Sequence, residues 1–340
     1  MQTSNNYIPL TSGEIGLLWN GFRSETMTLR ILTHFELVAE DEDIKKSLTD
    51  TISVIEEHIQ KYSDIYLKEE FPLPVGFTED DVNKKAPKLF SDTTAIFLLY
   101  SLSAAGMQFY TDSVISSARQ DIRMFTNGCL SNYSKLLNQT VDTLLTKGIY
   151  VRSPQIPYPD TIDFVQKQNY LAGWFGEKRP IHATQVHELT QNIHRNILGR
   201  TLLMGFEQSV KSDKVRTKMK EGKAFSKKVL DDFTLILKND DLESNTPSGF
   251  AVTQSTVAPF SDKLILETMI YINRSALVYY GKTLSISTRR DLFAFYEKLI
   301  VQTSLYTHEL LQLDIELGYL EEQPMAIDHN QLSQKNQARH

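Results

Sequence analysis

Four side chains in the second half of the chain are of the types that bind metal ions. His187 and His194 lie seven residues apart, which places both on one face of a helix, and Glu267 and His308 follow further along the chain. Imidazole nitrogens and carboxylate oxygens are common protein ligands of iron, manganese and zinc. A variant metal site built from these residues is therefore one hypothesis for the function.

The pattern that a paired-metal site in a helical bundle requires is absent from both halves of the sequence. Such a site takes one Glu from each of two helices and a Glu-x-x-His from each of the other two. No histidine of this chain has a glutamate three positions before it. Glu25 falls on the apolar face of a predicted helix, but Glu56, Glu57 and His58 are adjacent and point in different directions. We therefore expect no cofactor, and the alternative is iron, manganese or zinc held by the four residues named above.

Other catalytic motifs are also incomplete. His187-Glu188 lacks the second histidine of the His-Glu-x-x-His zinc motif, and neither a phosphate-binding loop nor a Gly-x-Ser-x-Gly turn occurs. Cys129 is the only cysteine, and its apolar helical surroundings predict a small buried side chain rather than a reactive thiol. We expect a protein without catalytic activity.

The elements that position these residues come from a tandem duplication. Residues 10–148 and 181–318 read as two copies of one unit, offset by 170 to 173 positions. The matching positions include Leu18 and Leu189, Phe35-Glu36 and Phe206-Glu207, Gly76-Phe77 and Gly249-Phe250, Phe90-Ser91-Asp92 and Phe260-Ser261-Asp262, and Tyr110 and Tyr280.

Each copy is predicted to form four helices, at 12–38, 42–69, 91–117 and 119–147, and then at 183–210, 213–238, 261–286 and 289–317, because apolar residues recur at steps of three and four. Short connections join the first helix to the second and the third to the fourth. The longer segments 71–89 and 240–259 can cross a helix of about 40 Å in extended form. Two hairpins with a long crossover are typical of ferritin-like bundles. The predicted fold is all-α, with two tandem ferritin-like four-helix bundles.

The topology decides whether the metal-ligand candidates could meet. In the crossover topology His187 lies at one end of the second bundle, whereas Glu267 and His308 lie at the other. In the competing up-down-up-down topology they would gather at one end. We favour the crossover.

Several polar residues shared by the copies read as folding signals. Ser91 is a predicted N-cap with Asp92 in the first helical turn. We expect Glu36 to pair with a neighbouring helix, and Arg119 with Asp121 to fix the corner between the third and fourth helices. Their counterparts are Ser261, Asp262, Glu207, Arg289 and Asp291.

The predicted domains are a first bundle at 1–149, a linker at 150–180, a second bundle at 181–324 and a polar, disordered tail at 325–340. The end of the linker places Trp174 and Phe175 between two glycines. We expect these side chains to dock in the groove between the bundles. The alternative is that they anchor a ligand or a partner.

Composition narrows the class of partner. The net charge of −6 argues against nucleic acid, which requires a basic surface. The sequence contains no run of 18 apolar residues, so no membrane span is predicted. The polar N-terminus does not resemble a secretory signal. We expect a cytoplasmic protein with a protein partner or with self-association.

The duplicated unit, the Arg-x-Asp that opens the fourth helix and the linker sequence Gly-Trp-Phe-Gly-Glu-Lys-Arg-Pro together resemble a family of unknown function numbered 3231, over nearly the whole chain. The resemblance implies an all-helical fold and a link to sporulation or to a coat F-like spore coat, and it implies no catalytic residues.

Three hypotheses follow. The first is a non-catalytic structural or interaction protein that is associated with the forespore or the spore. The second is a variant metal-binding bundle. The third is a binder of a small apolar ligand in the bundle interior, because aromatic residues such as Tyr100 and Tyr279 accompany small residues on the third helix of each copy.

Overall fold

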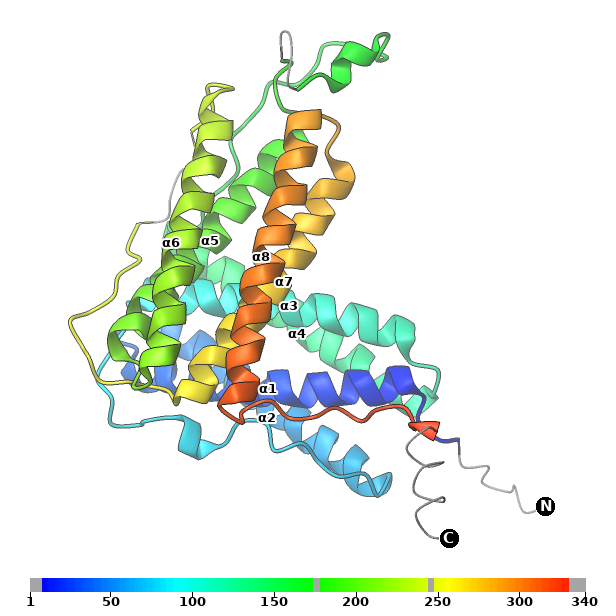
Figure 1. Ribbon diagram of the computed structural model, residues 1–340, viewed down its shortest axis with the longest axis vertical. Helices are drawn as coiled ribbons and strands as arrows, with labels where there is room; N and C mark the ends of the chain where they lie inside the picture. Colours follow the sequence, from blue (N-terminus) through cyan, green and yellow to red (C-terminus); the bar gives the residue numbers. More distant parts are fainter. Residues whose placement is uncertain (1–7, 174–177, 244–247, 330–340) are drawn as a thin grey trace.

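The computed structural model describes residues 8–173, 178–243 and 248–329, and within these ranges the chain is helical (Figure 1). The first bundle consists of α1 (Ser12–Val38), α2 (Glu42–Lys68), α3 (Asp92–Ser116) and α4 (Gln120–Thr146). The second consists of α5 (Ala183–Ser209), α6 (Asp213–Lys238), α7 (Asp262–Ile286) and α8 (Arg290–Glu316). Two 3-10 turns, η1 (Glu79–Asp81) and η2 (Gln168–Leu171), lie in the connections. The predicted all-α fold with two tandem bundles is confirmed.

The shared Ser-Asp pair starts the third helix of each bundle and also fixes its position. Ser91 accepts a hydrogen bond from the backbone N–H of Thr94, as an N-cap does. Asp92 accepts from the backbone N–H groups of Glu40 and Asp41, in the turn between α1 and α2, at 3.0 and 2.9 Å. Asp262 binds the α5–α6 turn in the same way. The residues read as caps thus also hold the two hairpins of each bundle together.

The helix ends establish the crossover topology. At one end of the first bundle, Arg119 at the start of α4 pairs with Glu69 at the end of α2, at 2.8 Å. At the other end, Lys147 after α4 pairs with Asp41 before α2, at 2.7 Å. Asp92 places the start of α3 beside that same turn. Therefore α2 runs antiparallel to α4 and parallel to α3, as the long connection predicts.

The two bundles share one hydrophobic core where they cross. Phe35 of α1 and Phe206 of α5 each contact both Phe90 and Phe260, which precede α3 and α7. Neighbouring ring centroids in this closed group of four are 5.6 to 6.4 Å apart. Each phenylalanine has its counterpart in the other copy, so the repeated Phe positions form the junction between the copies.

The two long crossovers also pair with each other. The backbone N–H of Ser91 donates to the oxygen of Ala251 at 3.1 Å, and the N–H of Ser261 donates to the oxygen of Asp81 at 2.9 Å. Isolated antiparallel bridges join Phe90 to Val252 and Val82 to Phe260. The third helix of each bundle therefore begins on the crossover of the other.

Tyr150 and Val151 line a pocket between the bundles, at the start of the described part of the linker. Its 3-10 turn lies at the far end of the second bundle (Figure 1). Arg179 donates to the backbone oxygen of Tyr170 at 3.0 Å, and Lys178 pairs with Asp291 at the start of α8. Trp174 and Phe175 lie outside the described residues. Their expected docking in the groove between the bundles therefore stays a prediction, and the crossovers and the shared core join the bundles.

Candidate functional site

The four metal-ligand candidates do not converge. His187 is exposed and lies 3.1 Å from the hydroxyl of Ser153, and His308 is exposed on α8. Glu267 forms an ion pair with Arg23 of the first bundle. His194 lines a pocket between the bundles. Across the described parts of the chain, no group of three His, Cys, Asp or Glu side chains has the geometry to hold a metal ion.

A polar cluster occupies the core of the first bundle at Glu25 instead. Glu25 is 2% exposed, and each of the other three helices supplies a side chain to its carboxylate. Tyr110 of α3 donates to it at 2.5 Å and Tyr133 of α4 at 2.9 Å, and Nδ1 of His58 on α2 lies 3.1 Å away. Asn132 contacts the second nitrogen of His58 at 3.1 Å. The cluster binds the four helices together.

Burial and the charge of Glu25 raise the pKa of both tyrosines well above the ordinary value, so both hydroxyls keep their protons. The second bundle carries Asn196 in place of Glu25 and Val229 in place of His58. There the amide of Asn196 donates to Tyr280 at 2.9 Å. We interpret both arrangements as satisfied core networks that fix helix packing.

Part of this cluster could be predicted from the sequence. Glu25 lies on the predicted core stripe, but the adjacency of Glu56, Glu57 and His58 concealed that His58 alone faces inward. His58 is 1% exposed, whereas Glu56 and Glu57 are exposed. The missed signal is a core-facing tyrosine on each of the third and fourth helices. Cys129, also buried beside the cluster, has its thiol pKa raised by burial, in agreement with the predicted inert side chain.

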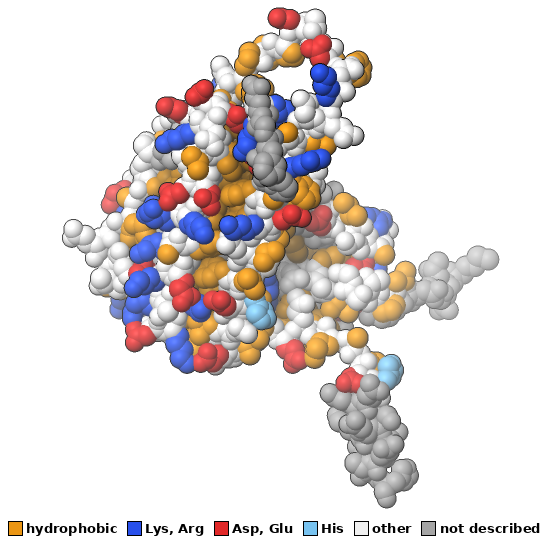
Figure 2. Space-filling view, turned by 45° about the horizontal axis from the view of Figure 1, so that its top comes forward, with side chains coloured by type: hydrophobic (Ala, Val, Ile, Leu, Met, Phe, Trp, Pro, Cys, Tyr) orange, Lys and Arg blue, Asp and Glu red, His pale blue; other side chains and the backbone are white. Residues whose placement is uncertain are grey.

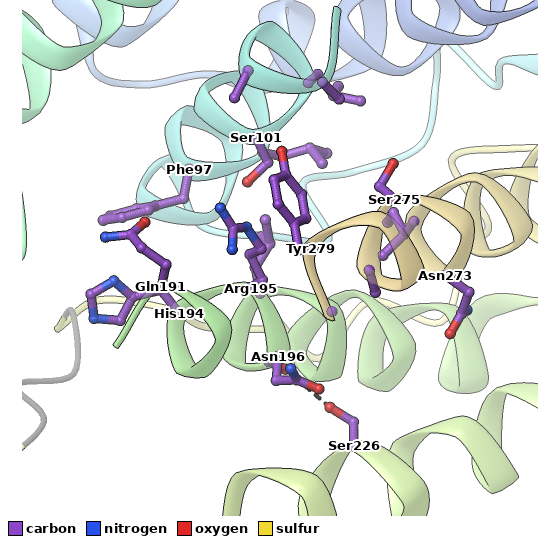
Figure 3. A pocket seen from close by; sticks show the side chains of 18 of the residues that line it. Phe97, Ser101, Gln191, His194, Arg195, Asn196, Ser226, Asn273, Ser275 and Tyr279 are labelled. Carbon is purple, nitrogen blue, oxygen red and sulfur yellow. Dashed lines mark hydrogen bonds between the residues drawn. The ribbon is translucent and has the colours of Figure 1, made fainter. Parts of the chain in front are cut away.

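Another candidate site is the junction pocket, defined as the pocket where α3 of the first bundle faces α5 and α7 of the second (Figure 3). Its volume is about 150 Å³. Aromatic side chains line it: Phe97, Tyr100, Tyr150, Tyr271, Tyr279 and Tyr306. The sequence predicted an apolar pocket inside a bundle, and the structure places it between the two.

Polar groups of the junction pocket come from several helices, and α5 supplies its cation. Gln191, His194 and Arg195 follow one another along this helix, and Figure 3 shows them on the side that faces α3. The guanidinium carbon of Arg195 lies 3.5 Å from the centroid of the Tyr279 ring, and Nη1 donates to the side-chain oxygen of Asn192 at 3.1 Å. Burial raises the pKa of Tyr100 to about 12, with a contribution from Tyr150. The pocket thus combines aromatic walls with a positioned cation.

A second pocket, of about 390 Å³, lies where α1, α3 and α7 meet. Ala105, Tyr271 and Ser275 border both pockets. Asn20 and Ser24 of α1 stand here at the positions that Gln191 and Arg195 take on α5. The lining carries charges of both signs, from Arg23, Asp112, Glu267 and Arg274. The duplication has therefore produced two related pockets with different electrostatics.

The surface carries further apolar side chains. Figure 2 shows hydrophobic side chains interspersed with charged ones over the visible face. In the linker, Tyr158, Ile162 and Phe164 are 98, 84 and 82% exposed. None of the helices within the described ranges is long and apolar enough to cross a membrane.

A comparison with curated proteins finds no match. Among solved structures, the crystal structure of a protein described as a "putative spore coat protein" from Bacillus halodurans C-125 matches with a TM-score of 0.41 and 16% identity, over 44% of this chain and 98% of that chain. The family model described as "Protein of unknown function (DUF3231)" matches residues 1–162 and again residues 169–332. The two halves that share a core are thus two copies of one family unit, and the chain belongs to the DUF3231 family.

Proposed function

We propose that this chain is a non-catalytic binding protein that holds a small, largely apolar molecule in the junction pocket. The observation that carries this proposal is an aromatic-lined space of about 150 Å³ at the crossing of the two bundles. A cavity of this size, in an engineered protein, is large enough to admit benzene.

The local sequence explains why space remains at this point. Ser101, Ala104 and Ala105 of α3 face Ser275 and Ala276 of α7 across the pocket. Small side chains on both helices leave volume that the surrounding rings border without filling, whereas the neighbouring four-phenylalanine core is closely packed. A ligand that fills the space would contact both bundles at once.

Calorimetric titration of the full chain with benzyl alcohol, a neutral single-ring probe, tests the proposal. Saturable binding is expected, and Ala104→Phe, which fills the pocket, should weaken it by about tenfold or more. Ala294→Phe is the matched control, because Ala294 lies on α8 outside the pocket lining and its counterpart, Met124, is already a large residue. Absence of saturable binding, or equal binding by both variants, would overturn the proposal.

A second candidate function is protein interaction, and the exposed linker side chains favour it. Tyr158, Ile162 and Phe164 lie within seven residues and are almost fully exposed, and large exposed apolar groups mark interaction surfaces. Replacing all three with serine should abolish any self-association that sedimentation equilibrium detects in the native chain. An unchanged mass distribution would count against this role.

The link with sporulation or the spore coat remains a prediction from the family resemblance. Immunodetection of the chain in fractionated spores and vegetative cells would test it. Enrichment in spores would support the link, and uniform presence in growing cells would oppose it.

A further inference from the structure

The junction pocket is lined by a positive charge without a negative one, among the described residues. Among the described residues that line it, Arg195 is the sole lysine or arginine, and none is an aspartate or glutamate. The second pocket differs in this respect, because its two arginines are accompanied by Asp112 and Glu267. The duplication provides an internal comparison, since Ser24 occupies the position of Arg195 in the first copy.

The guanidinium of Arg195 is held in place by two contacts. It stacks on the ring of Tyr279 at 3.5 Å, and Asn192, one helical turn earlier, accepts one of its N–H groups. A guanidinium has five N–H donors in a planar fork, which suits the two oxygens of a carboxylate. Figure 3 shows Arg195 and Tyr279 adjacent in the space between α5, α7 and α3.

The positive charge of Arg195 affects the pKa values of tyrosines in the pocket walls. Arg195 lowers the pKa of both Tyr100 and Tyr280, against the larger effect of burial that raises them. These tyrosines come from α3 and α7, so the cation acts across the pocket from one bundle to the other. No acidic side chain lines this partly buried site in the part of the chain that the structure describes, so a ligand anion would supply the missing charge.

We infer that the junction pocket selects a small aromatic carboxylate, with its ring between the aromatic walls and its carboxylate on Arg195. The volume admits a single ring, and a lining that includes Phe97, Tyr100 and Tyr271 favours an aromatic body over a branched aliphatic one. This inference rests on the proposed function and adds the charge and shape of the ligand.

Titrations with benzoate and with its neutral isostere benzamide, on the full chain, test the inference. Benzoate is expected to bind about tenfold more tightly than benzamide, because a charge-assisted bidentate contact replaces a neutral one. In Arg195→Gln this preference should fall to about onefold, while benzamide binding is retained. Arg200→Gln is the control, because it removes a positive charge from the same helix at a position outside the pocket lining, and the preference should persist.

The outcomes separate the inference from the proposed function. If neither probe binds, the proposed function fails and the inference fails with it. If both probes bind with equal affinity, or if the preference for benzoate survives Arg195→Gln, the pocket binds ligands but the charge selection is refuted. If Arg200→Gln abolishes the preference as well, the effect comes from the general field of α5, and the specific role of Arg195 is also refuted.

Discussion

Asp314 of α8 is a buried carboxylate whose removal should stabilise the protein. It is 0% exposed, and both carboxylate oxygens lack a hydrogen-bond partner. Burial raises its pKa from 3.8 to about 6, although Arg23, Lys263 and Arg274 oppose this shift. The first copy has Leu144 at the same position, also 0% exposed. The duplicated fold therefore accepts an apolar residue here.

The magnitude follows from the two pKa values. The difference between about 6 and 3.8 corresponds to about 3 kcal/mol at about 1.36 kcal/mol per pH unit. Because the folded-state pKa is the higher one, the folded state keeps the proton after the unfolded state has lost it. The contribution of Asp314 to stability is therefore complete below about pH 4, is lost as the pH rises from about 4 to 6, and stays lost above that range.

Urea unfolding of the native chain and of Asp314→Asn at pH 4 and pH 8 tests this reasoning. At pH 8 the variant should be more stable by about 2–3 kcal/mol, and at pH 4 the two proteins should differ by less than about 1 kcal/mol. Glu316→Gln is the control, because this carboxylate lies on the same helix but is exposed, and its removal should change the stability by less than about 1 kcal/mol. A variant that is less stable than the native chain at pH 8, or a difference independent of pH, would refute the account of Asp314.

Three further predictions concern packing and the Glu25 cluster. Gly205→Ala should destabilise the fold by about 1–3 kcal/mol in urea unfolding, because its Cβ would overlap the ring of Phe90. The added Cβ of Gly199→Ala has no neighbour within 4 Å, so this control should be neutral or stabilising by up to about 1 kcal/mol. Equal effects of the two changes would contradict the packing at the junction. Glu25→Ala should lower the free energy of unfolding by about 3 kcal/mol or more in the same assay, since it removes the buried acceptor of two tyrosine hydroxyls. A loss below about 1 kcal/mol would show that the cluster does not hold the four helices together. The buried tyrosines around Glu25 have raised pKa values, so their contribution to the stability of the fold is complete below about pH 10 and is lost at higher pH. Ultraviolet titration of the native chain should therefore show a group of tyrosines that ionise only on unfolding. Simple titration of all tyrosines near pH 10 would contradict this.

Local signals in the sequence were sufficient to predict the helices and their connectivity. Caps such as Ser91 and apolar steps of three and four depend on neighbours within a few residues, and they place helix ends within one or two positions of those observed. The predicted interhelical partners also exist, since Glu207 pairs with Lys223 and Glu36 accepts a hydrogen bond from Thr49 at 3.4 Å.

The joining of the copies could not be predicted from local signals. Phe90 reads as a helix-start residue, but its ring packs against Phe206 of the other copy. That contact depends on how two folded bundles dock, which periodicity within one helix does not encode. The position of the junction pocket could not be predicted for the same reason, because its walls come from helices of both copies. The small residues around Ala104 leave this space open only because the second bundle docks against them.

The crystal structure of the full chain soaked with benzoate would test the central claim most directly. The account predicts a ring within the aromatic lining of the junction pocket, with both carboxylate oxygens on the guanidinium of Arg195. Benzoate bound only elsewhere on the molecule, with the junction pocket empty, would contradict it.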